Sequence, residues 1–189
     1  RGEDFVNKLI EVYNLDANND KKLIATKTAE FIDERIVIIN RELGSTEAEL
    51  ENFKRSAGLT SISDANTFVQ ESSEYEKKRM DIGTQLNLME YLRDYIDNRA
   101  NQDAVIPSNV GVNDVSLSAL INKYNEMILE RNRLLRTSSE SNPVIIRKNS
   151  DLSAMRANIR SAINSVYKGL LISKEDIDRQ ASKYSNRID

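Results

Sequence analysis

The sequence predicts an all-α protein: an elongated antiparallel helical hairpin, or a coiled-coil-like bundle of about four helices. Glycine occurs only 6 times and proline twice, too few for the many turns of a β-rich fold. Hydrophobic residues make up 39% and charged residues 30% of the chain. Because the apolar residues recur at a regular period, this polar composition indicates long amphipathic helices that each bury a stripe.

The first helix is predicted over residues 4–57 or so. A polar stretch over residues 16–22 follows Phe5, Leu9, Ile10 and Tyr13, and a break near residues 18–20 is an open alternative. From Ile32 onward the apolar positions repeat every seven residues, which favours coiled-coil packing. One series is Ile32, Ile39, Thr46 and Phe53, and its companion is Ile36, Leu43, Leu50 and Ala57. Gly44 within this seam is interpreted as a tolerated helical glycine, although a mild bend is also compatible with it.

A turn at residues 58–63 separates this helix from a second one, predicted over about 64–98. Gly58 suits the C-terminal cap of the first helix, and Ser63 or Asp64 suits the N-cap of the second. The second seam is again spaced by seven and consists of Phe68, Tyr75, Ile82, Met89 and Ile96. A short turn between two such helices predicts an antiparallel hairpin.

Two further helices are predicted over about 114–136 and 150–188. Residues 101–113 interrupt the helical pattern with Pro107 and Gly111, and residues 137–149 interrupt it again around Pro143. The third helix has a wide apolar stripe, so we expect it to contact more than one neighbour. Its apolar positions are Leu117, Leu120, Ile121, Tyr124, Met127, Ile128, Leu134 and Leu135. The last helix, with Ser150 as its expected N-cap, has Leu152, Met155, Ile159, Ile163, Val166, Leu170, Ile177 and Tyr184.

We expect residues 1–189 to form a single elongated helical domain. The chain opens at Arg1 rather than methionine, which indicates a piece excised from a larger membrane protein. No apolar run approaches the roughly 20 residues needed to span a bilayer, so any membrane helices would lie outside this segment.

The composition excludes several kinds of site. Cysteine and histidine are both absent, which removes thiol nucleophiles, Ser-His-Asp triads and the usual zinc and Glu-x-x-His sites. Glycine-rich nucleotide motifs are absent as well. With a net charge of -3 and no basic stripe, nucleic-acid binding is not expected. We therefore predict no catalytic, cofactor-binding or metal-binding residue and no cofactor in this segment.

Acidic and hydroxyl side chains form a few candidate clusters. Asp16 and Asp20 are four residues apart and could bind a cation weakly, but a solvated surface is the favoured interpretation. Two further clusters are not expected to form a functional site. Glu47, Glu49 and Glu51 cannot share one helix face, because residues two apart on a helix point in different directions. Ser138, Ser139 and Ser141 lack a nearby base that would activate a hydroxyl group.

A basic region surrounds the Pro143 turn, formed by Arg131, Arg133, Arg136, Arg147 and Lys148. It could meet an anionic partner such as an acidic saccharide, a lipid headgroup or a neighbouring subunit. Pairing within the chain is favoured, with Glu126, Glu130 and Glu140 as the expected partners.

Two of the seven tyrosines, Tyr91 and Tyr95, are one helical turn apart. They could stack on sugars if exposed, although tyrosines on helical seams are more often interface residues.

Several stretches resemble a known family. Residues 9–14 (Leu-Ile-Glu-Val-Tyr-Asn), Asp20-Lys-Lys and residues 31–36 (Phe-Ile-Asp-Glu-Arg-Ile) resemble the opening of the periplasmic helical region of bacterial polysaccharide chain-length determinants. These proteins are also called polysaccharide co-polymerases and include the exopolysaccharide-type tyrosine kinases. Residues 124–136 and Ser141-Asn-Pro-Val resemble the return segment of the same family, and the likeness covers nearly the whole chain.

The resemblance implies a periplasmic segment of an inner-membrane protein that has two transmembrane helices. Such proteins assemble into rings and control the chain length or export of capsule, O-antigen or exopolysaccharide, with the polymerase and export machinery and the nascent polysaccharide as partners. A cytoplasmic tyrosine kinase domain would belong to the parent protein, and this segment would not itself be an enzyme. A periplasmic adaptor hairpin of an efflux or secretion system is the alternative.

Overall fold

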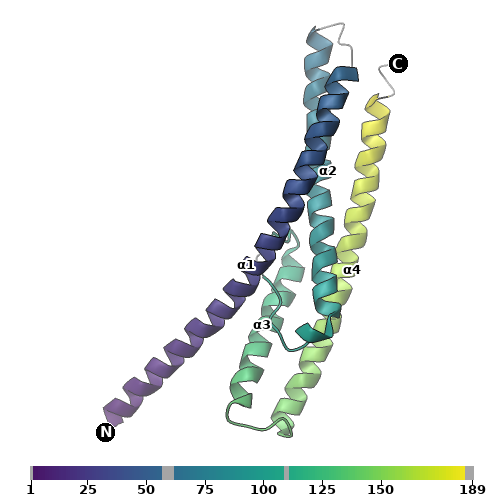
Figure 1. Cartoon of the computed structure of the whole chain (residues 1–189). Helices are drawn as coiled ribbons and strands as arrows, with labels where there is room; N and C mark the ends of the chain where they lie inside the picture. The colour runs from purple at the N-terminus through teal and green to yellow at the C-terminus, as the bar shows by residue number, and fades with distance from the viewer. Residues whose placement is uncertain (1, 57–61, 109–110, 186–189) are drawn as a thin grey trace. The chain divides into compact units, whose positions relative to one another are not determined.

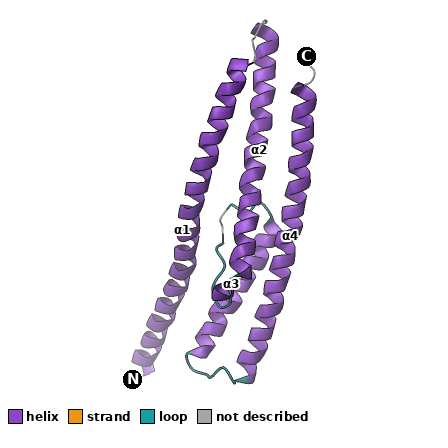
Figure 2. Cartoon of the chain, turned by 45° about the vertical axis from the view of Figure 1, so that its right-hand side comes forward, coloured by secondary structure: helices purple, strands orange, loops and turns teal. Residues whose placement is uncertain are grey.

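The computed structural model describes residues 2–56, 62–108 and 111–185, and within this part of the chain every regular element is helical. The elements are α1 (Gly2–Ser56), α2 (Ile62–Asp97), the 3-10 helix η1 (Arg99–Asn101), α3 (Val115–Leu135) and α4 (Pro143–Ser185), as Figures 1 and 2 show. The predicted all-α helical bundle is thereby confirmed.

The chain folds into two compact units. Unit one consists of residues 1–33 and 94–162, and unit two of residues 34–93 and 163–189. Because α1, α2 and α4 each contribute to both units, neither unit is a continuous stretch of sequence.

The core of unit one is built by α3 and α4 around the chain that follows α2. Its buried members lie three or four residues apart on α3 and seven residues apart on α4, so each helix presents one stripe to the other. They are Leu117, Ile121, Tyr124 and Ile128 on α3, and Ile145, Leu152 and Ile159 on α4. Phe31 of α1 and Ile96 of α2 are buried too. The four stripe residues of α3 were all predicted from the sequence.

Residues 105–108, between η1 and α3, are buried in unit one although they are not helical. Val105 and Ile106 have exposed fractions of 1% and 0%. Asn125 of α3 satisfies Ile106 at both main-chain groups, since its Oδ1 accepts from the Ile106 N–H at 2.8 Å and its Nδ2 donates to the Ile106 carbonyl at 2.7 Å. The Tyr95 hydroxyl donates to the Val105 carbonyl at 2.8 Å. Side chains thus supply the partners that a helix would otherwise provide.

Unit two joins α1, α2 and the second half of α4. Its buried apolar residues include Leu88, Met89 and Leu92 of α2, and Ile163 of α4. In the α1–α2 pair, which lies side by side in both views (Figures 1 and 2), Arg35 donates to the Thr84 carbonyl at 3.0 Å.

Polar contacts also join α2 to α4 within unit two. The Tyr167 hydroxyl donates to Glu90 at 2.9 Å, and Arg79 pairs with Asp178 at 2.8 Å. These contacts supplement the apolar packing of the same two helices.

The predicted seam on α2 is confirmed at its C-terminal positions, and the predicted seam on α1 is wrong where it begins. Met89 and Ile96 are buried, whereas Tyr75 and Ile82 are partly exposed and the Phe68 side chain lies outside the described residues. On α1 the prediction that Ile32 and Ile36 face the bundle is wrong, because they are 44% and 50% exposed. Phe31, one position earlier, is the residue that fills the core. The side chains of the later seam positions lie outside the described residues; they are Ile39, Leu43, Thr46, Leu50, Phe53 and Ala57.

Helix α1 is continuous through residues 18–20 and through Gly44, so no break occurs at either place. The helix caps predicted at the turn between α1 and α2 have different outcomes. Gly58 lies outside the described residues, and Ser63 and Asp64 lie inside α2 instead of preceding it.

Helix α4 begins at Pro143, seven residues before the predicted start at Ser150. Proline fits the first helical position because its missing N–H would have no partner there. The Asn142 side chain accepts from the Val144 N–H at 2.9 Å and serves as the N-cap. The predicted interruption is therefore shorter, and Ile145 belongs to the core.

Helix α3 starts where it was predicted, after Asp114, whose carboxylate accepts from the Leu117 N–H at 2.7 Å. Nearby, Gly111 adopts a φ of 85°, a backbone conformation that side chains other than that of glycine disfavour. Among the described helices, none is long and apolar enough to cross a membrane.

Candidate functional site

The most developed polar site of unit one lies at the C-terminal end of α2. The last four carbonyls of an α-helix have no partner inside the helix. Here the Ile96 carbonyl accepts from Nε and Nη2 of Arg156 on α4, at 3.1 and 2.6 Å. Nη1 of Arg156 donates to the Asn101 carbonyl at 3.0 Å and to the Gln102 carbonyl at 3.4 Å. One guanidinium thus caps α2 and holds η1 against α4.

Tyr124 completes this arrangement from α3. Its hydroxyl donates to the Gln102 carbonyl and accepts from Arg156, both at 3.0 Å. Burial raises the pKa of the Tyr124 phenol above its usual range, and the neighbouring Arg156 charge opposes part of that shift. The phenol therefore stays neutral and works as a hydrogen-bond relay.

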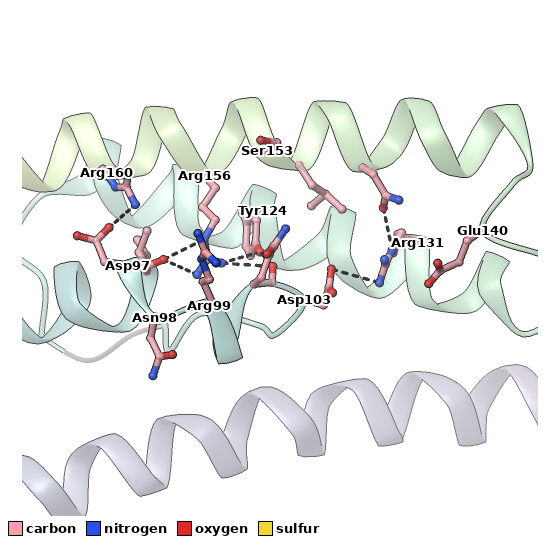
Figure 3. A pocket seen from close by; sticks show the side chains of 14 residues that line it. Asp97, Asn98, Arg99, Asp103, Tyr124, Arg131, Glu140, Ser153, Arg156 and Arg160 are labelled. Carbon is pink, nitrogen blue, oxygen red and sulfur yellow. Dashed lines mark hydrogen bonds and ion pairs between the residues drawn. The ribbon is translucent and has the colours of Figure 1, made fainter.

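A cavity of about 470 Å³ adjoins these groups (Figure 3). It lies between η1, α3 and α4, and polar side chains dominate its lining. The charged residues of the lining are Arg99, Arg131, Arg156, Arg160, Asp97, Asp103 and Glu140. Four arginines against three carboxylates leave one net positive charge at neutral pH.

Two of these arginines have carboxylate partners. Arg160 pairs with Asp97, and Arg131 pairs with Asp103 at 3.4 Å while donating from Nε to Asn149 at 2.9 Å. Arg131 is 8% exposed, so its charge is balanced inside the unit.

The basic region predicted around Pro143 is largely neutralised within the chain. Arg133 and Arg136 of α3 pair with Asp20 and Asp16 of α1. The favoured prediction of pairing within the chain is therefore right for these residues, but the partners differ from those expected.

Only one of the three expected glutamates accepts a cation of the basic region. Lys148 pairs with Glu130 at 2.7 Å, whereas Glu126 pairs with Lys123 at 3.7 Å. Arg147 is exposed, and no ion pair joins it to another described residue.

The two acidic residues Asp16 and Asp20 do share one face of α1, as their spacing predicted. Their cations are guanidinium groups of α3, and no group of three or more acidic side chains arranged for a metal ion occurs among the described residues.

The other predicted candidates are also placed. Ser139 and Ser141 hydrogen-bond to each other at 2.6 Å, and Ser138 accepts from the Asn142 amide at 3.0 Å, as in a polar turn. The Tyr95 hydroxyl donates a hydrogen bond to the Val105 carbonyl, and burial raises the pKa of the Tyr95 phenol. Tyr91 is partly exposed, and the side chains of Glu47, Glu49 and Glu51 lie outside the described residues.

Arg99, Arg156 and Arg160 were not singled out from the sequence. Arg156 and Arg160 look like solvated positions of an amphipathic helix, and their partners come from a segment whose course no periodicity reveals. The sequence held one signal, the spacing of four residues between Arg156 and Arg160, which places both arginines on one face of α4.

Comparison with family models, with characterised proteins and with solved structures gives no match to this chain.

Proposed function

We propose that this chain is a non-catalytic helical scaffold, the periplasmic segment of an inner-membrane polysaccharide co-polymerase. The observation that supports this proposal is a set of exposed apolar side chains on α1. No described part of the same unit covers them. Phe5, Leu9 and Val12 are 70%, 58% and 51% exposed, and their spacing of four and three places them on one face. Contiguous exposed apolar surface of this kind marks a contact with another molecule or a membrane.

The same feature recurs on the part of α1 that belongs to unit two. Ile36 and Val37 are 50% and 60% exposed there. In this proposal lateral contacts with neighbouring copies cover these side chains, and ring geometry then influences polymer growth or export. The order of the family-like stretches along the chain supports the same assignment.

No reaction is assigned to the segment. The polar groups of its main hydrogen-bond network, Arg156 and Tyr124, are engaged with main-chain carbonyls and with each other. Any tyrosine kinase activity would reside in a cytoplasmic domain of the parent protein.

The sequence that flanks this segment in its full-length protein tests the assignment directly. A co-polymerase requires a membrane helix on each side. Lipoyl-like β-motifs on both sides would support the adaptor hairpin instead, and the absence of flanking membrane helices would refute the proposal.

A second experiment tests the contact surface. We expect the double substitution Phe5→Ser and Leu9→Ser to weaken assembly of the full-length protein in lipid discs, measured by mass photometry. Val115→Ser on α3 is the matched control, because Val115 is 84% exposed but lies outside α1. Unchanged assembly of the double variant, or equal loss in the control, would contradict a role for the α1 face.

A further inference from the structure

The cavity beside η1 has the size of a small-molecule site. Its volume of about 470 Å³ falls inside the range of roughly 300–1,000 Å³ that is usual for ligand pockets. All its lining residues belong to unit one, and they come from the end of α2, η1 and the chain after it, α3, the α3–α4 connection and α4.

Charge is distributed unevenly among the four arginines of the cavity. Arg131 and Arg160 are balanced by Asp103 and Asp97. The hydrogen-bond acceptors of Arg156 are all uncharged: the carbonyls of Ile96, Asn101 and Gln102, and the Tyr124 hydroxyl. Carbonyls at a helix C-terminus stabilise a cation, but they leave its full charge in place.

Arg99 adds a second unbalanced cation at the same end. It is the first residue of η1, the turn whose Asn101 carbonyl Arg156 holds, and no ion pair joins it to another described residue. Figure 3 shows the labelled side chains of Arg99 and Arg156 among those that line the cavity. Guanidinium groups recognise carboxylate and phosphate oxygens through paired N–H donors.

The rest of the lining offers hydrogen-bonding groups of both kinds. Gln102, Asn149 and Ser153 can donate and accept, and Glu140 can accept. No ion pair joins Glu140 to another described residue. Such a lining suits a body rich in hydroxyl groups better than an apolar one.

We propose that this cavity binds a small polyhydroxylated anion, whose carboxylate or phosphate group is held by the paired N–H donors of Arg99, while Arg156, whose N–H groups mostly bond to carbonyls, contributes its uncompensated charge. The site is separate from the assembly surface of α1, so either proposal can fail without the other. Uronic acids and sugar phosphates share the required chemistry, and the probes below distinguish them.

Calorimetric titration of the 189-residue chain tests the site with glucuronic acid, glucose 6-phosphate, glucose and inorganic phosphate. We expect at least one of the two anionic sugars to bind at least tenfold more tightly than glucose and than inorganic phosphate. Preference for glucuronic acid identifies a carboxylate ligand, and preference for glucose 6-phosphate a phosphate ligand. No heat from either sugar at millimolar concentration, or equal binding of inorganic phosphate, would overturn the proposal.

Arg99→Gln should weaken binding of the preferred sugar at least tenfold. The fold should persist, because Arg99 is exposed and makes no ion pair with the described residues, and circular dichroism can verify this. Arg147→Gln is the matched control, since it removes the same charge from an exposed position outside the cavity. Equal weakening by both substitutions would show general charge attraction and would refute a defined site.

Discussion

At the scale of single residues, two polar side chains in unit one hydrogen-bond to main-chain groups that lack helical partners. Asn125 is 2% exposed and serves both groups of Ile106, while Arg156 serves the end of α2 and the turn after it. An unpaired buried main-chain group costs roughly 1–3 kcal/mol, so these two side chains determine where the connecting segment can lie.

Replacing Asn125 with alanine should lower the free energy of unfolding by about 2–4 kcal/mol, because it leaves the Ile106 N–H and carbonyl without partners. Urea denaturation followed by circular dichroism measures the change. Asn122→Ala on the exposed face of α3 is the control and should change stability by less than about 0.5 kcal/mol. A similar small effect at both positions would mean that water satisfies Ile106 instead.

At the scale of elements, helix ends depend on single side chains, and this is where the sequence-based boundaries were least accurate. The start of α3 was predicted to within one residue, and the structure shows that the Asp114 side chain caps the helix there. Pro143 was interpreted as part of a break, although proline also fits the first turn of a helix. Composition cannot separate these two roles, since both place a polar residue before the proline.

Asn142→Ala should therefore destabilise the chain by about 1 kcal/mol, because it removes the N-cap of α4. Thermal melts of the variants provide the measurement. Ser150→Ala should have little effect, since Ser150 lies inside the helix, and Asn158→Ala at an exposed mid-helix position should be neutral or stabilising. A larger loss at Ser150 than at Asn142 would restore the later helix start.

At the scale of the whole molecule, the fold class followed from periodicity, whereas the site did not. Scarce glycine and proline and the stripes of α3 and α4 were sufficient to predict a helical bundle. Phe31 and Ile32 are adjacent and both apolar, so spacing alone could not decide which one faces the core. The cavity depends on where residues 98–108 run, and long-range contacts that no local pattern records determine that course.

Stability should fall in alkaline solution because two phenols of unit one are buried. Burial raises the pKa of Tyr95 and of Tyr124 above the ordinary value of 10.0. In the unfolded chain the same phenols ionise first, so the unfolded state binds fewer protons above that pH. The contribution of each phenol is fully present below pH 10, and it is lost as pH rises from there through the pKa of the folded state.

Urea midpoints at a series of pH values between 8 and about 11.5 can measure this loss. The double variant Tyr95→Phe and Tyr124→Phe should show a shallower decline over the same interval, whatever its stability at pH 8. An identical decline in the double variant would assign the pH dependence to other groups.

The ion pairs between α1 and α3 also have a consequence for the order of folding. Arg133 and Asp20 are 113 residues apart in sequence, whereas Arg131 and Asn149, which join α3 to α4, are 18 apart. Closing the longer loop costs about 1.6 kcal/mol more chain entropy. The α3–α4 hairpin should therefore form before the start of α1 attaches to it. Since synthesis proceeds from the N-terminus, the turns of unit one that are synthesised first are among the last in that unit to find their native neighbours.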